Sequence, residues 1–102
     1  MNTENIYGDY EVTESATFGG VIYGAVTVKS GVTFINEGRI HGEVTVEKTA
    51  VLDNVGCIHG ALRGEGFAEL RGTYHGPISI SHYHIHANAV INGITREEEE
   101  TV

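Results

Sequence analysis

A short phrase made of an aliphatic or aromatic residue, a variable residue and a glycine returns along the whole chain, and it constrains the fold more than any other feature. Ile40-His41-Gly42 is the clearest copy, with a further glycine two positions before it and an aliphatic residue two positions after it. The last glycine of each copy falls at positions 8, 24, 42, 60, 76 and 93, so the copies lie 16 to 18 residues apart. Six copies fill nearly all of the 102 residues, which is typical of solenoid repeat proteins.

A shorter period of six lies within each repeat, because large apolar side chains recur at about every sixth position. Three hexads make one turn of about 18 residues, so the pattern predicts three columns of inward-facing side chains. The predicted first column is Ile6, Ile22, Ile40, Ile58, Tyr74 and Ile91. The second is Val12, Val28, Val46, Gly64 and Ile80, and the third is Phe18, Phe34, Leu52, Leu70 and Ile85. In the two 16-residue steps, the two missing residues are assigned to the stretches that directly follow Phe18 and Leu70.

These columns predict an all-β fold, a single-stranded, three-sided parallel β-solenoid of about six turns with 16–18 residues per turn. The spacing of six and the abundance of Val, Ile and Thr disfavour amphipathic helices. Glycine and asparagine, for example Gly38, Asn36 and Asn54, are expected at the corners because both tolerate tight bends. The solenoid is expected to span residues 6–94, between a polar lead over residues 1–5 and an acidic tail over residues 95–102. The handedness of the coil stays open.

The charge and cysteine content limit the possible partners. The formal net charge is −8 with only six Lys and Arg residues, so we expect no binding to nucleic acid, which needs a basic surface. A single cysteine excludes an internal disulfide framework and fits a reducing compartment. Because the sequence shows no signal peptide and no long apolar span, we expect a cytoplasmic protein without direct membrane insertion.

The phrase Gly-x-[Ile/Val]-x-Gly-x-[Ile/Val], repeated about once per turn between residues 6 and 94, resembles the repeats of bactofilins, which are bacterial polymer-forming cytoskeletal proteins. Residues 38–44 and 56–62 carry the resemblance most clearly. It implies a right-handed, three-sided β-helix that polymerises end to end without nucleotide. The hexads are also similar to those of left-handed β-helical acyltransferases and gamma-class carbonic anhydrases, but this chain lacks their helical C-terminal segment and long loop insertions.

The two ends of a solenoid expose unpaired backbone N–H and C=O groups that can pair with another chain. The favoured function is therefore that of a non-enzymatic structural protein that associates with itself end to end through its terminal turns. The residues expected at these ends are Ile6, Tyr10, Val12, Ile91 and Ile94. The first turn shows no cap, whereas Arg96 and the four glutamates at 97–100 could prevent docking at the other end.

The residue that follows each first-column residue should face solvent, which predicts one outward stripe along the molecule. Its members are Tyr7, Tyr23, His41, His59, His75 and Asn92, of which the first five are the candidate partner-binding residues. Simple stacking between turns, a partner-binding surface and a metal site are three open interpretations. The alternative function is accordingly a small acidic binding module, such as an immunity or inhibitor protein that neutralises a basic toxin or nuclease.

His82, His84 and His86 alternate along one predicted strand, about 6–7 Å apart per step. They could share a metal only if a corner brought them together, and His75 from the preceding turn is a further candidate. We favour a distorted final turn without a metal and expect no cofactor. Cys57 is expected to be a packing residue, because no basic cluster lies near it in the sequence. No catalytic arrangement emerges, so no enzyme activity is predicted.

Overall fold

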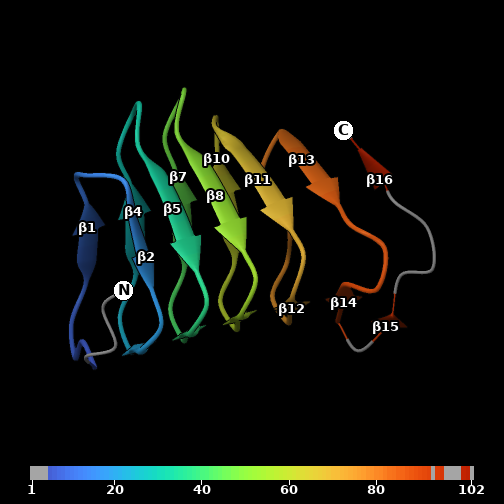
Figure 1. The fold of residues 1–102 in the computed structure, drawn as a ribbon, viewed down its shortest axis with the longest axis horizontal. Helices are drawn as coiled ribbons and strands as arrows, with labels where there is room; N and C mark the ends of the chain where they lie inside the picture. Colours follow the sequence, from blue (N-terminus) through green and yellow to red (C-terminus); the bar gives the residue numbers. More distant parts are fainter. Residues whose placement is uncertain (1–4, 93, 96–99, 102) are drawn as a thin grey trace.

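The computed structural model describes residues 5–92, 94, 95, 100 and 101, in which all regular secondary structure is β. The chain winds as a three-sided parallel β-solenoid whose turns stack along the long axis of a molecule of 33 × 24 × 22 Å (Figure 1). This confirms the predicted fold class. The described residues form about five turns and not six, because Ile6 adds only a single bridge to Ile22 and the last turn is followed by antiparallel strands.

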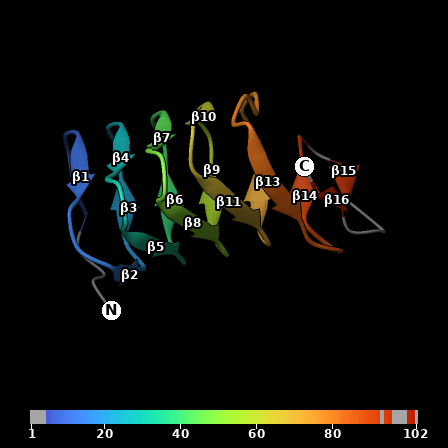
Figure 2. The same ribbon diagram turned by 90° about the horizontal axis from the view of Figure 1, so that it is seen from above.

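Each side of the solenoid is one sheet, in which every strand pairs with the equivalent strand of the next turn (Figure 2). The first side consists of β3 (Val21–Ile22), β6 (Arg39–Ile40), β9 (Cys57–Ile58), β12 (Thr73–Tyr74) and β14 (Val90–Ile91). The second side consists of β1 (Tyr10–Val12), β4 (Val26–Val28), β7 (Val44–Val46) and β10 (Leu62–Gly64). The third side consists of β2 (Ala16–Phe18), β5 (Thr33–Asn36), β8 (Val51–Asn54), β11 (Phe67–Leu70) and β13 (His82–Ile85).

Two short antiparallel strands close the C-terminal end. β15 (Ile94–Thr95) pairs with β14, and β16 (Glu100–Thr101) pairs with β13. The part of the chain that the structure describes contains no helix of the length and apolarity that a membrane span needs. Of the predicted acidic tail, residues 96–99 and 102 lie outside the described residues.

The first two predicted columns are confirmed by the strand register. Ile22, Ile40, Ile58, Tyr74 and Ile91 are aligned in successive turns and buried. Val12, Val28, Val46 and Gly64 are aligned in the same way on the second side. Because parallel strands of successive turns lie about 4.8 Å apart, each column forms a continuous apolar ladder through the core.

The third predicted column is wrong in its register. Phe18 is aligned with Asn36 and not with Phe34, whose own partners are Ala16 and Leu52. The two residues that the first turn lacks are therefore missing from the corner before Phe18, not from the stretch after it. In the second turn this corner is a closed turn in which the Val32 N–H donates to the Lys29 carbonyl at 3.2 Å. The same correction applies to Leu70, which is aligned with Asn54 and not with Leu52, so the second loss lies before Leu70.

Asn36 and Asn54 end β5 and β8, next to the corners where the sequence predicted them, and both side chains are wholly buried. The Asn36 Nδ2 donates to the Asn54 Oδ1 at 2.9 Å, and the Asn54 Nδ2 donates to the Thr73 carbonyl at 3.3 Å. The Gly38 N–H also donates to the Asn36 Oδ1 at 3.2 Å. This asparagine ladder satisfies buried amides between turns, so that polar side chains can occupy the core next to Leu70.

Two columns of glycine flank the short strands of the first side and explain the repeated phrase. The upstream column is Gly20, Gly38, Gly56 and Gly72, and the downstream column is Gly8, Gly24, Gly42, Gly60 and Gly76. A Cβ on Gly42 would lie 2.5 Å from the carbonyl carbon of Gly24 and 2.7 Å from the Ala25 nitrogen. From Gly24 onward, side chains are thus excluded at these corners because the backbone of the preceding turn occupies the space, whereas Gly8 in the first turn has no such neighbour among the described residues.

Candidate functional site

The predicted stripe forms a stacked column on the outer face of the first side, which we call the Tyr/His ladder: Tyr7, Tyr23, His41, His59 and His75. Successive ring centroids are 4.9–5.2 Å apart and their planes differ by 4–8°. The rings stack at the spacing of the turns because each one directly follows a residue of the first column. Tyr7 is 78% and Tyr23 47% exposed, so the ladder offers aromatic surface to solvent.

His59 is the central histidine of the ladder, and its surroundings shift its pKa. Partial burial, followed by the charges of His75, His41 and Arg39, lowers the pKa of His59 below its usual value of 6.5. The central imidazole therefore favours its neutral form. A neutral ring between two aromatic neighbours suits apolar or hydrogen-bonding contacts more than ionic ones.

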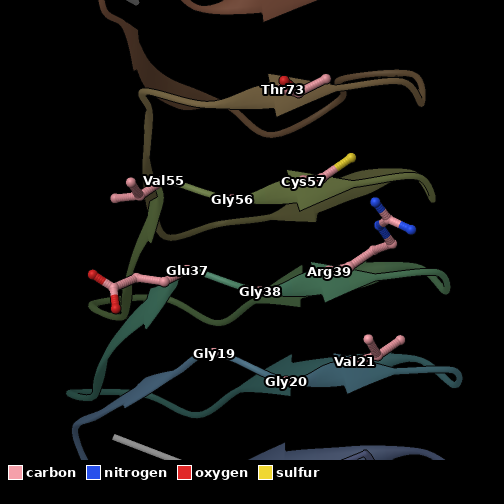
Figure 3. A pocket seen from close by; sticks show the side chains of 10 residues that line it. All are labelled: Gly19, Gly20, Val21, Glu37, Gly38, Arg39, Val55, Gly56, Cys57 and Thr73. Carbon is pink, nitrogen blue, oxygen red and sulfur yellow. The ribbon is translucent and has the colours of Figure 1, made fainter. Parts of the chain in front are cut away.

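A shallow groove of about 600 Å³ runs along the corner between the first and third sides (Figure 3). Its floor is the upstream glycine column, where the lack of side chains exposes the backbone. Arg39, Cys57 and Thr73 stand along one wall, and Glu37 and Val55 along the other. Arg39 and Cys57 in the wall of the groove come directly before Ile40 and Ile58, and the ladder residues His41 and His59 come directly after them. The groove therefore lies beside the Tyr/His ladder.

The surroundings of Cys57 correct one prediction. Its Sγ lies 3.5 Å from the Nε2 of His59, and Arg39 is its register partner in the preceding turn. The cysteine is thus partly exposed and lies beside the basic side chains of His59 and Arg39, whereas the sequence had suggested that no basic group is near it. Sequence reasoning missed this contact, although a cysteine two positions before an outward histidine on one strand carries the signal.

Two groups of side chains among the described residues bring three possible metal ligands within 4.8 Å of one another. One group is Cys57, His59 and His75 on the first side, and the other is Glu69, His84 and His86 on the third. The corner after β13 does bring His84 and His86 together, with ring centroids 4.1 Å apart. His82 is exposed and belongs to neither group, and His75 lies in the Tyr/His ladder and not beside His84.

The residues predicted for self-association lie at both ends of the solenoid. Ile6 and Tyr10 are half-buried at the N-terminal end, and Val12 is buried below them. Ile91 is buried at the C-terminal end, where its register partner is Ile94 in the antiparallel strand β15. The side chain of Ile94 lies outside the described residues.

The fold and these surfaces define the chain as a three-sided parallel β-solenoid of the repeat class. No protein-family model, curated protein or solved structure matches it.

Proposed function

We propose that this protein is a non-enzymatic structural protein that associates with itself end to end through its terminal turns, as its resemblance to bactofilins implies. The observation that carries the proposal is the open N-terminal turn. Within the described part of the chain, no strand pairs with the outer edge of β1 or of β2. An open strand edge is a template for pairing with another chain.

The backbone of β1 is prepared for such pairing. The Tyr10 N–H donates to the Ala25 carbonyl at 2.8 Å, and the Val12 carbonyl accepts from the Lys29 N–H at 3.1 Å. Alternate residues of a strand in a parallel sheet bond to opposite neighbours, so the N–H and C=O of Glu11 face the free edge. A second molecule could therefore add a strand here without disturbing the existing hydrogen bonds.

The C-terminal end is less open than the N-terminal end. β15 and β16 cover the outer edges of β14 and β13, and each contains only two residues. Very short edge strands are poor templates for pairing. We therefore assign the principal association surface to the N-terminal turn.

The test is light scattering after gel filtration, with negative-stain microscopy, on untagged protein at several concentrations. Glu11→Pro removes the outward N–H and should abolish assembly, since proline on an edge strand cannot donate to a new partner. Glu11→Ala removes the same side chain but keeps the N–H, so it should assemble like the wild type. Ile6→Lys, which brings a charge to the same end of the solenoid, should also prevent assembly. A wild-type mass that does not change with concentration, or assembly that survives Glu11→Pro, would refute the proposal.

A second candidate function is a small acidic binding module, and the Tyr/His ladder is the observation that favours it. Exposed tyrosines and histidines supply flat, amphipathic contact area of the kind enriched at interfaces. The net charge of −8 would speed association with a basic protein such as a toxin or nuclease.

This candidate is tested by changing Tyr23, His41 and His59 together to alanine. Binding to a basic partner should weaken while the circular dichroism spectrum stays that of the wild type. Thr27→Ala with Thr45→Ala on the second side is the matched control and should bind normally, because these two residues are also aligned on an outer face. Equal binding by both variants would exclude the ladder as the interface.

A further inference from the structure

We propose that Glu69, His84 and His86 form a binding site for a divalent transition-metal ion, and that Zn²⁺ is the ion this set of ligands suits best. Each side chain offers one ligand atom, and the three atoms lie within 4.8 Å of one another. Imidazole nitrogen and carboxylate oxygen are common zinc ligands, and they also suit other first-row metals. The site does not depend on the proposed self-assembly, because it lies on the outer face of the third side.

The stacked turns bring the three side chains together. Glu69 in β11 is the register partner of His84 in β13, so these two stand directly above one another on adjacent turns. His86 follows two residues later, and Ile85 between the two histidines is buried in the core. The His86 N–H donates to the Leu70 carbonyl at 3.0 Å, which ties its backbone to the preceding turn.

The corner after β13 places the two imidazoles closer than an extended strand would. Alternate residues of a strand are about 6–7 Å apart, whereas the rings of His84 and His86 have centroids 4.1 Å apart and planes inclined by 23°. At this corner the Ala89 N–H donates to the His86 carbonyl at 3.2 Å, and Asn88 has a positive φ of 73°. The turn thus begins at His86 and allows its side chain to lean back over His84.

The distances fit one metal ion. The His86 Nε2 lies 3.5 Å from the Glu69 Oε1. Two ligands bound at about 2.0–2.1 Å to a tetrahedral zinc ion are about 3.4 Å apart, so this pair is already close to the required separation. Glu69 and His86 are only partly shielded, with 29% and 17% of their side-chain surface exposed, so small rotations can complete the site.

The charges around the site favour a cation. Asp53 precedes Glu69 on the same face of the third side and adds a second carboxylate, while Arg71 is the neighbouring cation. Arg71 contacts Asp53 at 3.2 Å and Glu69 only at 3.7 Å, so it can stay bound to Asp53 while Glu69 turns to a metal. The overall charge of −8 adds long-range attraction for cations.

The cluster of Cys57, His59 and His75 is the rival site on this chain, and it is less suited to one ion. Its two imidazoles are separated by a full turn, with centroids 4.9 Å apart and planes only 8° apart, so their nitrogens point in parallel directions. Arg39, the register partner of Cys57, adds positive charge beside it. We therefore assign the metal to the third side and use the rival cluster as the control.

The experiment is isothermal titration of untagged, metal-stripped full-length protein with ZnCl₂. We expect one zinc ion per chain for the wild type. His86→Ala and Glu69→Gln should each weaken binding by at least about tenfold, since even the loss of an outer-shell partner of a metal site costs about 10–100-fold. His82→Ala and Cys57→Ser should leave the affinity unchanged, because these residues lie outside the site.

A second measurement separates loss of a ligand from loss of the fold. Glu69→Gln keeps the size of the side chain, and circular dichroism without metal should show that the variant is folded like the wild type. Titration with Co²⁺ should give visible bands of a tetrahedral ion without a thiolate charge-transfer band. Absence of zinc retention in equilibrium dialysis, unchanged affinity in both ligand variants, or loss of binding in Cys57→Ser would each overturn the proposal.

Discussion

Replacing Gly42 by alanine should destabilise the protein by about 3–5 kcal/mol, because the added methyl group meets the backbone of the preceding turn. A Cβ at this position would lie 2.5 Å from the Gly24 carbonyl carbon and 2.7 Å from the Ala25 nitrogen, and closer still to the Gly24 oxygen. These are backbone atoms, so no side-chain rotation relieves the overlap. The two turns must instead move apart locally.

The magnitude follows from what that movement disrupts. The Val26 N–H donates to the Glu43 carbonyl at 2.8 Å, and the His41 N–H donates to the Ile22 carbonyl at 2.9 Å, on either side of the corner. Separating the turns enough to admit a methyl group weakens both bonds, at about 1 kcal/mol each. Overpacking adds about 1–3 kcal/mol.

Gly8→Ala is the matched control, because Gly8 holds the same place in the phrase but belongs to the first turn. A Cβ on Gly8 would meet no atom of the described residues within 4 Å. The variant should therefore be as stable as the wild type, or more stable by about 0.4–1 kcal/mol through the lower entropy of its unfolded chain. Denaturation in urea, followed by circular dichroism, measures both variants. A difference below about 1 kcal/mol between them would refute the steric argument.

Three further changes test the interior and the ladder. Asn54→Ala removes both hydrogen bonds of a buried amide and should cost about 2–4 kcal/mol in urea denaturation; a cost below about 1 kcal/mol would show that the asparagine ladder contributes little. In an NMR titration the pKa of His59 should lie below 6.5. His75→Asn should bring the pKa of His59 only part of the way back to 6.5, because burial lowers it more than the charge of His75 does. The pKa of His59 is lower in the folded protein than in the unfolded chain, where it is about 6.5. The contribution of neutral His59 to the free energy of unfolding is therefore complete above pH 6.5 and declines as the pH falls toward the pKa of the folded protein. Tyr74→Phe should leave stability unchanged or raise it by up to about 1 kcal/mol, because its buried hydroxyl has no hydrogen-bond partner among the described residues; a clear loss of stability would contradict this.

The sequence was sufficient to predict the solenoid and two of its three columns, because the repeated phrase aligns the first side directly and the second column follows the first by a constant six residues. The third side was predicted wrongly because counting by six aligns Phe18 with Phe34. Only the actual path of the corner before Phe18, which lacks the closed turn seen at residues 29–32, shows that Phe18 stacks on Asn36.

Of the candidate sites, the Tyr/His ladder could be predicted from the sequence, whereas the group of Glu69, His84 and His86 could not. The outward stacking of the Tyr/His ladder follows from alternation along a strand, and its geometry agrees with the prediction. The meeting of His84 with His86 depends on a corner conformation that residue spacing does not determine. Glu69 was absent from the predicted metal ligands because only the register between turns places it beside His84.

The glycine columns also determine how the length of such a molecule can change. From Gly24 onward, the corner glycines are fitted to the backbone of the turn just before them. A whole turn can therefore be gained or lost without altering the fit of the remaining turns, whereas a part of a turn cannot. The distance between the two ends of the solenoid can therefore change only in steps of about 4.8 Å, one step for each whole turn. The number of repeats in the sequence thus determines the length of the molecule.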